Sequence, residues 1–117
     1  MIAPLNDVRV YLVLGNTDLR KSIDGLSALV AGQLGLDPFC GHLFAFANRS
    51  RTAVKILIWD RNGFWVFHKR LEKQRFRWPK SEVDVQDVTA RELRWLLDRI
   101  DPSKMDGHKR IDYSHIV

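Results

Sequence analysis

Apolar side chains in the first third of the chain follow a strand pattern and then a helical one. Residues 8–14 are rich in β-branched and aromatic side chains, which predicts a strand. Apolar side chains over residues 18–34 fall on one stripe at helical spacing. Thr17 or Asp18 can cap the start of this helix through a side-chain oxygen, and Gly35 can end it in the left-handed conformation. We therefore expect a strand followed by a long helix.

Three further runs have the composition of strands: residues 42–47, 53–59 and 64–70. The second and third flank residues 60–63 (Asp-Arg-Asn-Gly), where asparagine and glycine tolerate the positive φ of a tight turn. The sequence leaves open which two of these residues form the tip, but the parity of the pairing is the same either way. These runs therefore predict a β-hairpin preceded by another strand.

The two faces of the predicted hairpin differ in polarity, because side chains alternate along a strand. The more apolar face consists of Val54, Ile56, Ile58, Trp65, Phe67 and Lys69. The other face consists of Lys55, Leu57, Trp59, Phe64, Val66, His68 and Arg70. We expect the helix over 18–34 to cover the first face, which would leave a cationic cluster at one end of the second.

The last third of the chain predicts one edge strand and one short helix. Residues 75–79 (Arg-Phe-Arg-Trp-Pro) alternate like a short edge strand that a proline ends. Thr89 and Glu92 have the spacing of a capping box directly before an apolar run, which predicts a helix over about 90–99. Residues 103–117 lack a clear period.

Together these elements predict an α+β fold. We expect an antiparallel sheet of about four to five strands, one long helix packed across a face and a second short helix towards the C-terminus. The chain of 117 residues has the length of one domain, which we place at residues 1–102. Residues 103–117 are expected to form a tail that is loose or docked on a partner.

The positive charge of the chain is concentrated in its middle third. Residues 49–80 hold ten basic and two acidic side chains, whereas the chain as a whole has a formal net charge of only +5. Aromatic residues are interleaved with these cations, and such a strip suits nucleic acid, with cations for the phosphates and rings for the bases. A solvated sheet face and a protein-docking surface are the two other interpretations.

The predicted nucleic-acid-binding strip consists of side chains from this middle third. They are Arg49, Arg51, Lys55, His68, Lys69, Arg70, Arg75, Arg77 and Trp78. Arg20 and Lys21 form a second candidate set near the start of the first helix. Cations there oppose the positive end of the helix dipole, which indicates a contact with phosphate or with an acidic partner.

The residue sets that catalysis or metal binding requires are missing from the sequence. The predicted sheet supplies one carboxylate, Asp60, whereas a two-metal nuclease needs several. The four histidines lack the spacing of a zinc site, and Cys40 is the only cysteine. No glycine-rich phosphate-binding loop is present. We therefore expect a protein that is not an enzyme and that uses neither a metal nor another cofactor.

The chain carries no pattern of export or membrane insertion. Its start lacks a basic stretch followed by an apolar run, as a signal peptide would have. Its apolar runs are far shorter than the roughly 20 residues that cross a bilayer. We expect a cytoplasmic protein with no membrane partner.

Five strings of residues, in order and with family-like gaps, resemble a known family. They are residues 15–26 (GNTDLRKSIDGL), 37–46 (DPFCGHLFAF), 54–60 (VKILIWD), 63–65 (GFW) and 69–79 (KRLEKQRFRWP). The chain resembles, over about residues 8–115, the accessory protein of insertion sequence 66 family elements, the product of their second open reading frame, often called TnpB. It departs from the family pattern at Gln74, where glycine is usual, and at Cys40, where serine is usual. The first departure argues against a tight turn at 73–75.

The resemblance implies a role in DNA transposition beside a separate, larger transposase. It brings no catalytic or binding residues to carry over. We expect a non-catalytic accessory factor that binds element DNA through the basic strip and assists the transposase. The alternative is a protein–protein adaptor that docks on the transposase, or on the element's other accessory protein, without touching DNA. The sequence leaves a homo-oligomer open in both cases.

Overall fold

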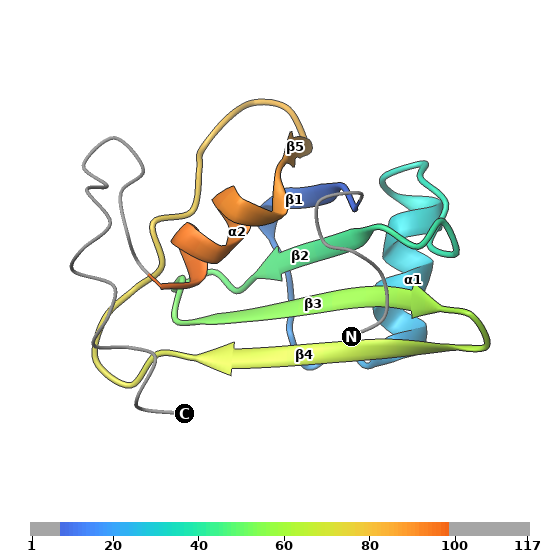
Figure 1. The fold of residues 1–117 in the computed structure, drawn as a ribbon. Helices are drawn as coiled ribbons and strands as arrows, with labels where there is room; N and C mark the ends of the chain where they lie inside the picture. Colours follow the sequence, from blue (N-terminus) through green and yellow to red (C-terminus); the bar gives the residue numbers. More distant parts are fainter. Residues whose placement is uncertain (1–7, 99–117) are drawn as a thin grey trace.

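The described part of the chain folds around one mixed β-sheet. The structure, a computed structural model, describes residues 8–98. The sheet has five strands in the order β4-β3-β2-β1-β5 and is accompanied by two short helices (Figure 1). The strands are β1 (Val10–Asn16), β2 (Leu43–Ala47), β3 (Ala53–Asp60), β4 (Gly63–Arg70) and β5 (Val85–Val88), and the helices are α1 (Ile23–Gly32) and α2 (Ala90–Leu97).

Strands β1 and β2 pair in parallel, whereas the other three strand pairs of the described sheet are antiparallel. Parallel neighbours need a crossover connection, and α1 lies in the connection that leads from β1 to β2. The prediction of an antiparallel sheet under a long helix over 18–34 is therefore wrong. The sheet is mixed, and α1 has ten residues.

The helix is shorter than predicted because residues 17–22 span the end of the sheet in irregular conformation. The backbone N–H of Thr17 bonds to β2, and the carbonyl of Lys21 accepts a hydrogen bond from β3. Asp18 does not cap the helix, since its carboxylate bonds to Arg20 instead. Ser22 is the N-cap residue and makes no side-chain capping bond. The apolar side chains over residues 18–34 therefore contact the sheet along this stretch, although only residues 23–32 are helical.

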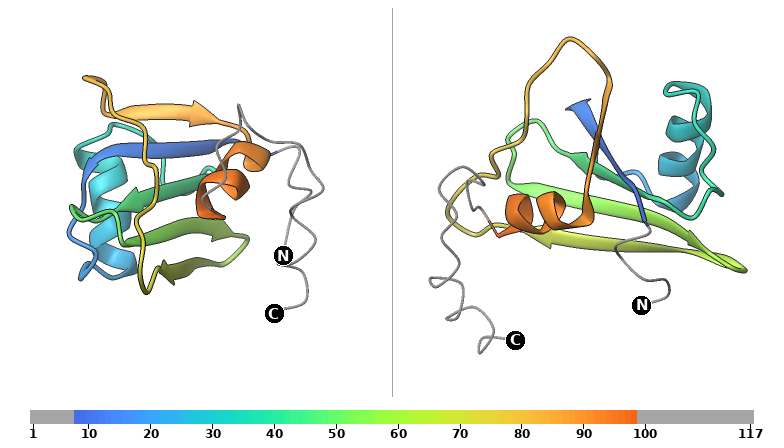
Figure 2. Two further views of the ribbon diagram at one scale, coloured as in Figure 1. Left: turned by 90° about the vertical axis from the view of Figure 1, so that its left-hand side faces the viewer. Right: turned by 45° about the horizontal axis from the view of Figure 1, so that its top comes forward.

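Helix α1 builds the core on one face of the sheet. Leu26 and Val30 are fully buried and belong to one cluster with Phe44, Phe46 and Leu57. Apolar side chains at the i and i+4 positions of a helix lie one above the other, which is why this pair faces the sheet. Figure 2 (left) shows α1 and α2 on opposite faces of the sheet.

The second face of the sheet is covered by α2 and by the irregular segment of residues 71–80. Leu93 of α2 and the side chains of Phe76 and Trp78 are buried against Val54, Ile56 and Ile58. The more apolar face of the hairpin thus takes these elements rather than α1, and the expectation that the first helix covers it is wrong. Strand β2, which lies between the two cores, is buried at all five positions.

Residues 75–79 are not a strand, although their side chains alternate as in one. Phe76 and Trp78 point into the core, and the indole Nε1–H of Trp78 donates to the carbonyl of Val13 at 2.9 Å. The backbone N–H of Phe76 donates to the carbonyl of Arg51 at 2.7 Å. These bonds hold an extended segment over the sheet without a ladder of paired strands. The edge of the sheet on the β1 side is instead β5.

The hairpin and the capping box are confirmed. Asp60 pairs with Gly63, so the tip is residues 61–62, with Arg61 at a φ of 59°. The Thr89 hydroxyl accepts a hydrogen bond from the backbone N–H of Glu92, and the Glu92 carboxylate accepts one from the N–H of Thr89, both at 3.0 Å.

The predicted tail of residues 103–117 and the last residue of the predicted helix over 90–99 lie outside the described residues. Within the described part of the chain, no helix has the length and apolar character that crossing a bilayer requires.

We predict that Trp78→Phe lowers the free energy of unfolding by about 1–3 kcal/mol, because it removes a donor from a carbonyl in the buried core. Trp95→Phe is the matched control, since Trp95 is half-buried beside Arg91 on α2. The measurement is urea unfolding followed by circular dichroism. Equal losses in the two variants would contradict a specific role for the Trp78 hydrogen bond.

Candidate functional site

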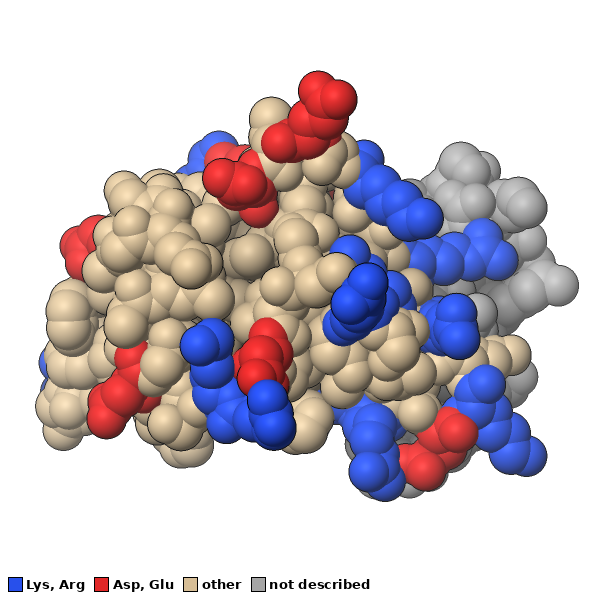
Figure 3. Space-filling model, turned by 180° about the vertical axis from the view of Figure 1, so that it is seen from behind, with Lys and Arg blue, Asp and Glu red and all other residues tan. Residues whose placement is uncertain are grey.

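A shallow groove of about 730 Å³ lies at the end of the sheet where β1, β2 and β4 finish. Three separate segments form it: the loop after β1, the turn between β2 and β3, and the last residues of β4. Its polar and charged lining includes Asp18, Arg20, Arg49, Ser50, His68 and Arg70. Figure 3, a view from behind, shows most of the Lys and Arg side chains of that side in the right-hand half.

The turn between β2 and β3 is held by the side chain of Asn48. Its Oδ1 accepts hydrogen bonds from the backbone N–H groups of Thr52 and Ala53, at 3.0 and 3.1 Å. Its Nδ2 donates to the Thr52 hydroxyl at 3.1 Å, and the same hydroxyl bonds to that of Ser50 at 2.8 Å. The amide and hydroxyl groups are thus used within the turn, and Arg49 lies exposed at its tip.

Arg20 is held over the groove by its neighbour Asp18. The Arg20 guanidinium donates to both carboxylate oxygens of Asp18, at 3.0 and 2.8 Å, and the Arg20 backbone N–H donates at 3.0 Å. These bonds, from the side chain first and then from the backbone, hold the pKa of the Asp18 carboxyl well below its usual range. Asp18 therefore stays ionised at neutral pH and is the ion-pair partner of the exposed Arg20 side chain.

Two further cations belong to this region: Lys55 lies beside the groove, and Arg70 lines it. Lys55 of β3 pairs with His68 of β4, so their side chains share one face of the sheet. The Lys55 Nζ donates to the carbonyl of Lys21 at 3.0 Å, which ties the loop before α1 to the sheet. Arg70, two residues after His68 on the same face, contacts the carboxylate of Glu72 at 3.2 Å.

The groove and its rim therefore hold more positive than negative charge. Five Lys or Arg side chains (Arg20, Lys21, Arg49, Lys55 and Arg70) accompany two carboxylates, Asp18 and Glu72. Among residues 8–98, ion pairs involve Arg20 and Arg70 but not Arg49, Lys21 or Lys55. The arrangement is thus suited to an anion, with a surplus of three positive charges.

Five residues of the predicted strip lie away from the groove, and three of them, Trp78, Lys69 and Arg51, have structural contacts. Trp78 is 6% exposed and belongs to the core. Lys69 faces the α2 side, where its Nζ donates to the carbonyl of Leu97 at 2.7 Å and lies 3.9 Å from Asp98. Arg51 turns inward. These side chains hold the fold together and do not line the groove.

Arg51 adopts a φ of 61° and bonds to two backbone carbonyls. Its guanidinium donates to Asn48 at 3.3 Å and to Leu14 at 3.2 Å. Burial lowers the pKa of the Arg51 guanidinium, but the ordinary value for arginine is so high that the side chain stays charged at neutral pH. Arg51 thereby links the turn between β2 and β3 to β1.

Arg75 and Arg77 are exposed on the segment that follows β4, on either side of the buried Phe76. Both engage other groups. Neither lines the groove, although the segment that carries them is bonded to Arg51 at the same end of the sheet.

Sequence reasoning missed the polar residues that shape the groove, chiefly Asn48, Ser50 and Asp18. A signal was present: Asn48 and Ser50 follow a strand-like run directly, and asparagine and serine favour turns because their side chains bond to nearby backbone. Asp18 has the sequence pattern of a helix cap, but in the structure its carboxylate bonds to Arg20.

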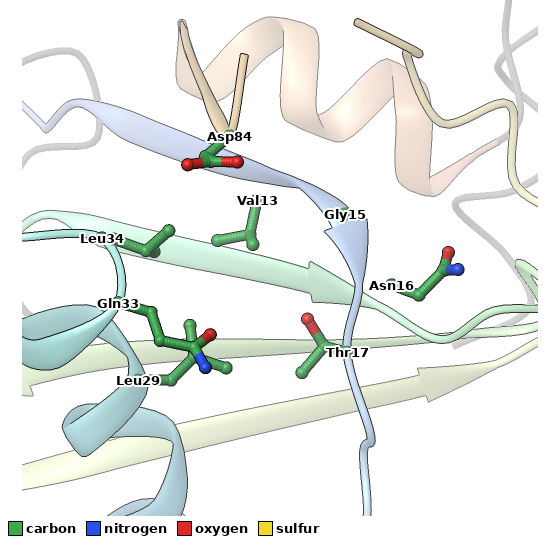
Figure 4. A pocket seen from close by; sticks show the side chains of 8 residues that line it. All are labelled: Val13, Gly15, Asn16, Thr17, Leu29, Gln33, Leu34 and Asp84. Atoms are coloured by element: carbon green, nitrogen blue, oxygen red, sulfur yellow. The ribbon is translucent and has the colours of Figure 1, made fainter. Parts of the chain in front are cut away.

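A second, smaller pocket of about 140 Å³ lies beside β1 on the α1 side (Figure 4). Val13, Leu29 and Leu34 line it together with the polar side chains of Thr17 and Gln33. Its volume fits only a few water molecules, at about 30 Å³ each. Among the described residues, no group of three or more His, Cys, Asp or Glu side chains is placed to hold a metal ion.

We predict that Arg51→Ala lowers the free energy of unfolding by about 1–3 kcal/mol, because two carbonyls lose a charged donor. Arg49→Ala, two residues away, is the control and should change this free energy by less than about 0.5 kcal/mol, since Arg49 is exposed. Chemical denaturation measures both. A larger effect at Arg49 than at Arg51 would refute the assignment of the two side chains.

Comparison with known proteins points to one family. The family model described as IS66 Orf2 like protein matches residues 8–107. Two proteins of Sinorhizobium fredii (strain NBRC 101917 / NGR234) are similar over 101 residues, or 86% of this chain. "Uncharacterized protein y4hO" is 36% identical, with 88% of its own length covered, and "Uncharacterized protein y4jC" is 29% identical, with 86% covered. No solved structure matches.

The family match includes all of the described sheet, both helices and every residue of the groove. The chain therefore belongs to the IS66 Orf2-like family, the accessory proteins of insertion sequence transposition.

Proposed function

We propose that this protein is a non-catalytic accessory factor that binds element DNA through the groove and presents it to the transposase. The observation that carries the proposal is the convergence of Arg20, Arg49 and Arg70, from three segments far apart in the sequence, on one surface. Cations that converge in this way match the closely spaced phosphates of a nucleic-acid backbone.

The chemistry of the groove favours phosphates over bases. Among the described residues no Phe, Tyr or Trp side chain lines it, and the imidazole of His68 is the one ring that it offers to a base. The amide of Asn48 and the hydroxyl of Ser50 are engaged within their turn, which leaves the cations as the main donors. Contacts of this kind position a protein on DNA without reading its sequence. Sequence choice would then come from the transposase or from the element's other accessory protein.

The two ion pairs of the groove compete only weakly with the proposed contact. Arg20 and Arg70 each have a carboxylate partner, so a phosphate would compete with Asp18 and Glu72. Both pairs are exposed, and exposed pairs contribute little free energy, so this competition is weak. Arg49 has no such competitor among the described residues, and it is the cation we expect to contribute most.

We predict that affinity for a duplex of element DNA falls steeply with salt. If four or five phosphates are neutralised, the slope of log affinity against log salt concentration is about −4. Fluorescence anisotropy of a labelled duplex with the full-length protein measures it between low and moderate salt. No binding at low salt, together with a stable complex with the purified transposase, would refute DNA contact and support the adaptor.

We further predict that Arg49→Glu weakens DNA binding roughly tenfold or more at about 0.1 M salt, because one phosphate contact is lost and a like charge is introduced. Arg61→Glu is the control with the same charge change: Arg61 is exposed at the hairpin tip, away from the groove. It should change affinity less than threefold, a margin set by long-range charge alone. Equal losses would show that net charge, not the groove, governs binding.

A further inference from the structure

Strand β4 leaves one edge of the sheet open. It forms the lower edge in Figure 1, and no strand of residues 8–98 pairs with its outer side. Proteins usually protect such edges with bulges, prolines, charged side chains or a short strand. β4 has eight residues, contains no proline, has its Lys and Arg only at its last two positions and keeps a regular register with β3 along its whole length. Its outward-facing backbone N–H and C=O groups can therefore form a ladder with another strand.

Two large aromatic side chains are exposed on β4. Trp65 is 53% exposed and Phe67 44% exposed, and their rings stack with centroids 6.1 Å apart. The indole of Trp65 donates to the carboxylate of Asp60 at 3.1 Å, which fixes its orientation. Exposed neighbouring aromatics mark interaction surfaces. Because Trp65 and Phe67 pair with Ile58 and Ile56, they lie on the α2 side of the sheet, away from the groove.

The charges of the hairpin indicate what can pair with this edge. The cations of β4, Lys69 and Arg70, lie at its end, whereas Asp60 lies at the hairpin tip opposite Gly63. Lys69, whose Nζ also contacts Leu97 and Asp98 of its own copy, occupies the same face as Asp60. A second β4 in antiparallel orientation places Lys69 beside Gly63 of the second copy, with Asp60 of that copy immediately beyond. Glycine has no side chain to separate them. A parallel arrangement would set like charges side by side, which is destabilising.

We propose that two copies of this protein pair through antiparallel β4 strands about a two-fold axis at Val66. Trp65 of each copy then lies beside Phe67 of the other on one face, and the two sheets join into one. Such a contact is self-complementary, as a two-fold interface requires. Cross-strand aromatic pairs add stability of about 0.2–1 kcal/mol each beyond the backbone ladder.

The dimer does not depend on DNA binding, but it arranges the grooves. Because the axis is perpendicular to the sheet, both grooves open on the same side of the joined sheet. The two Arg70 residues are then about 27 Å apart along the strands, from a rise of about 3.4 Å per residue. The dimer and the DNA contact are tested independently, because oligomeric state tests the dimer and DNA affinity tests the contact.

Cysteine cross-linking tests the register. In a background with the exposed Cys40 replaced by serine, Val66→Cys places two thiols opposite each other across the axis. Opposed residues of antiparallel strands have Cα atoms about 5 Å apart, within disulfide range. Arg70→Cys is the control, because its two copies are too distant to join. Mild oxidation should give a covalent dimer with Val66→Cys only. No dimer, or equal cross-linking at both positions, would overturn the proposal.

Sedimentation of the full chain tests the aromatic contact. The unmodified protein should sediment as a dimer, and Phe67→Lys should raise the dissociation constant roughly tenfold or more, because it removes the ring and sets two like charges near each other. Phe39→Lys is the matched control, since Phe39 is also an exposed aromatic but lies outside β4. Circular dichroism checks that each variant is folded. A monomer at every concentration, or equal weakening by both variants, would contradict the β4 interface.

Discussion

The parallel pairing of β1 with β2 is the constraint on which the rest of the structure depends. Parallel neighbours oblige the chain to return from the end of one strand to the start of the other, and the loop of residues 17–22 with α1 makes this return. The loop passes the ends of β2 and β3 and so brings Arg20 to the turn that carries Arg49. The groove therefore follows from the topology, and it lies at the carboxyl ends of the parallel pair, where open α/β sheets bind ligands.

Local signals in the sequence were enough to find most of the individual elements. The hairpin of β3 and β4 and the capping box of α2 each depend on residues close together in the chain, and both are confirmed. Whether β1 and β2 run parallel or antiparallel depends on long-range contacts, and the spacing of apolar residues along the chain does not indicate it. Alternation also fails at residues 75–79, because an extended segment that buries every second side chain has the same pattern as an edge strand. β5 has only four residues, too few to give a clear period.

For the candidate site as well, the sequence indicates which residues are cationic but not where each side chain lies. Charge counting located the cationic part of the chain, and strand parity placed Lys55, His68 and Arg70 on one face, as the register has them. Residue type could not tell Arg49, which is exposed, from Arg51, which bonds to two backbone carbonyls. That difference depends on a positive φ at Arg51 and on the carbonyl of Leu14, which is remote in sequence.

The segment of residues 71–80 has a consequence for how the molecule unfolds. Its hydrogen bonds to Arg51 and Val13 connect the end of β4, at one edge of the sheet, to β1, three strands further in. The irregular segment of residues 71–80 thus connects β4 and β1, which are not neighbours in the sheet. If this segment detached, the core on the α2 side would be exposed along several strands at once. Cooperative unfolding of the sheet therefore depends on residues 71–80, which have no secondary structure of their own.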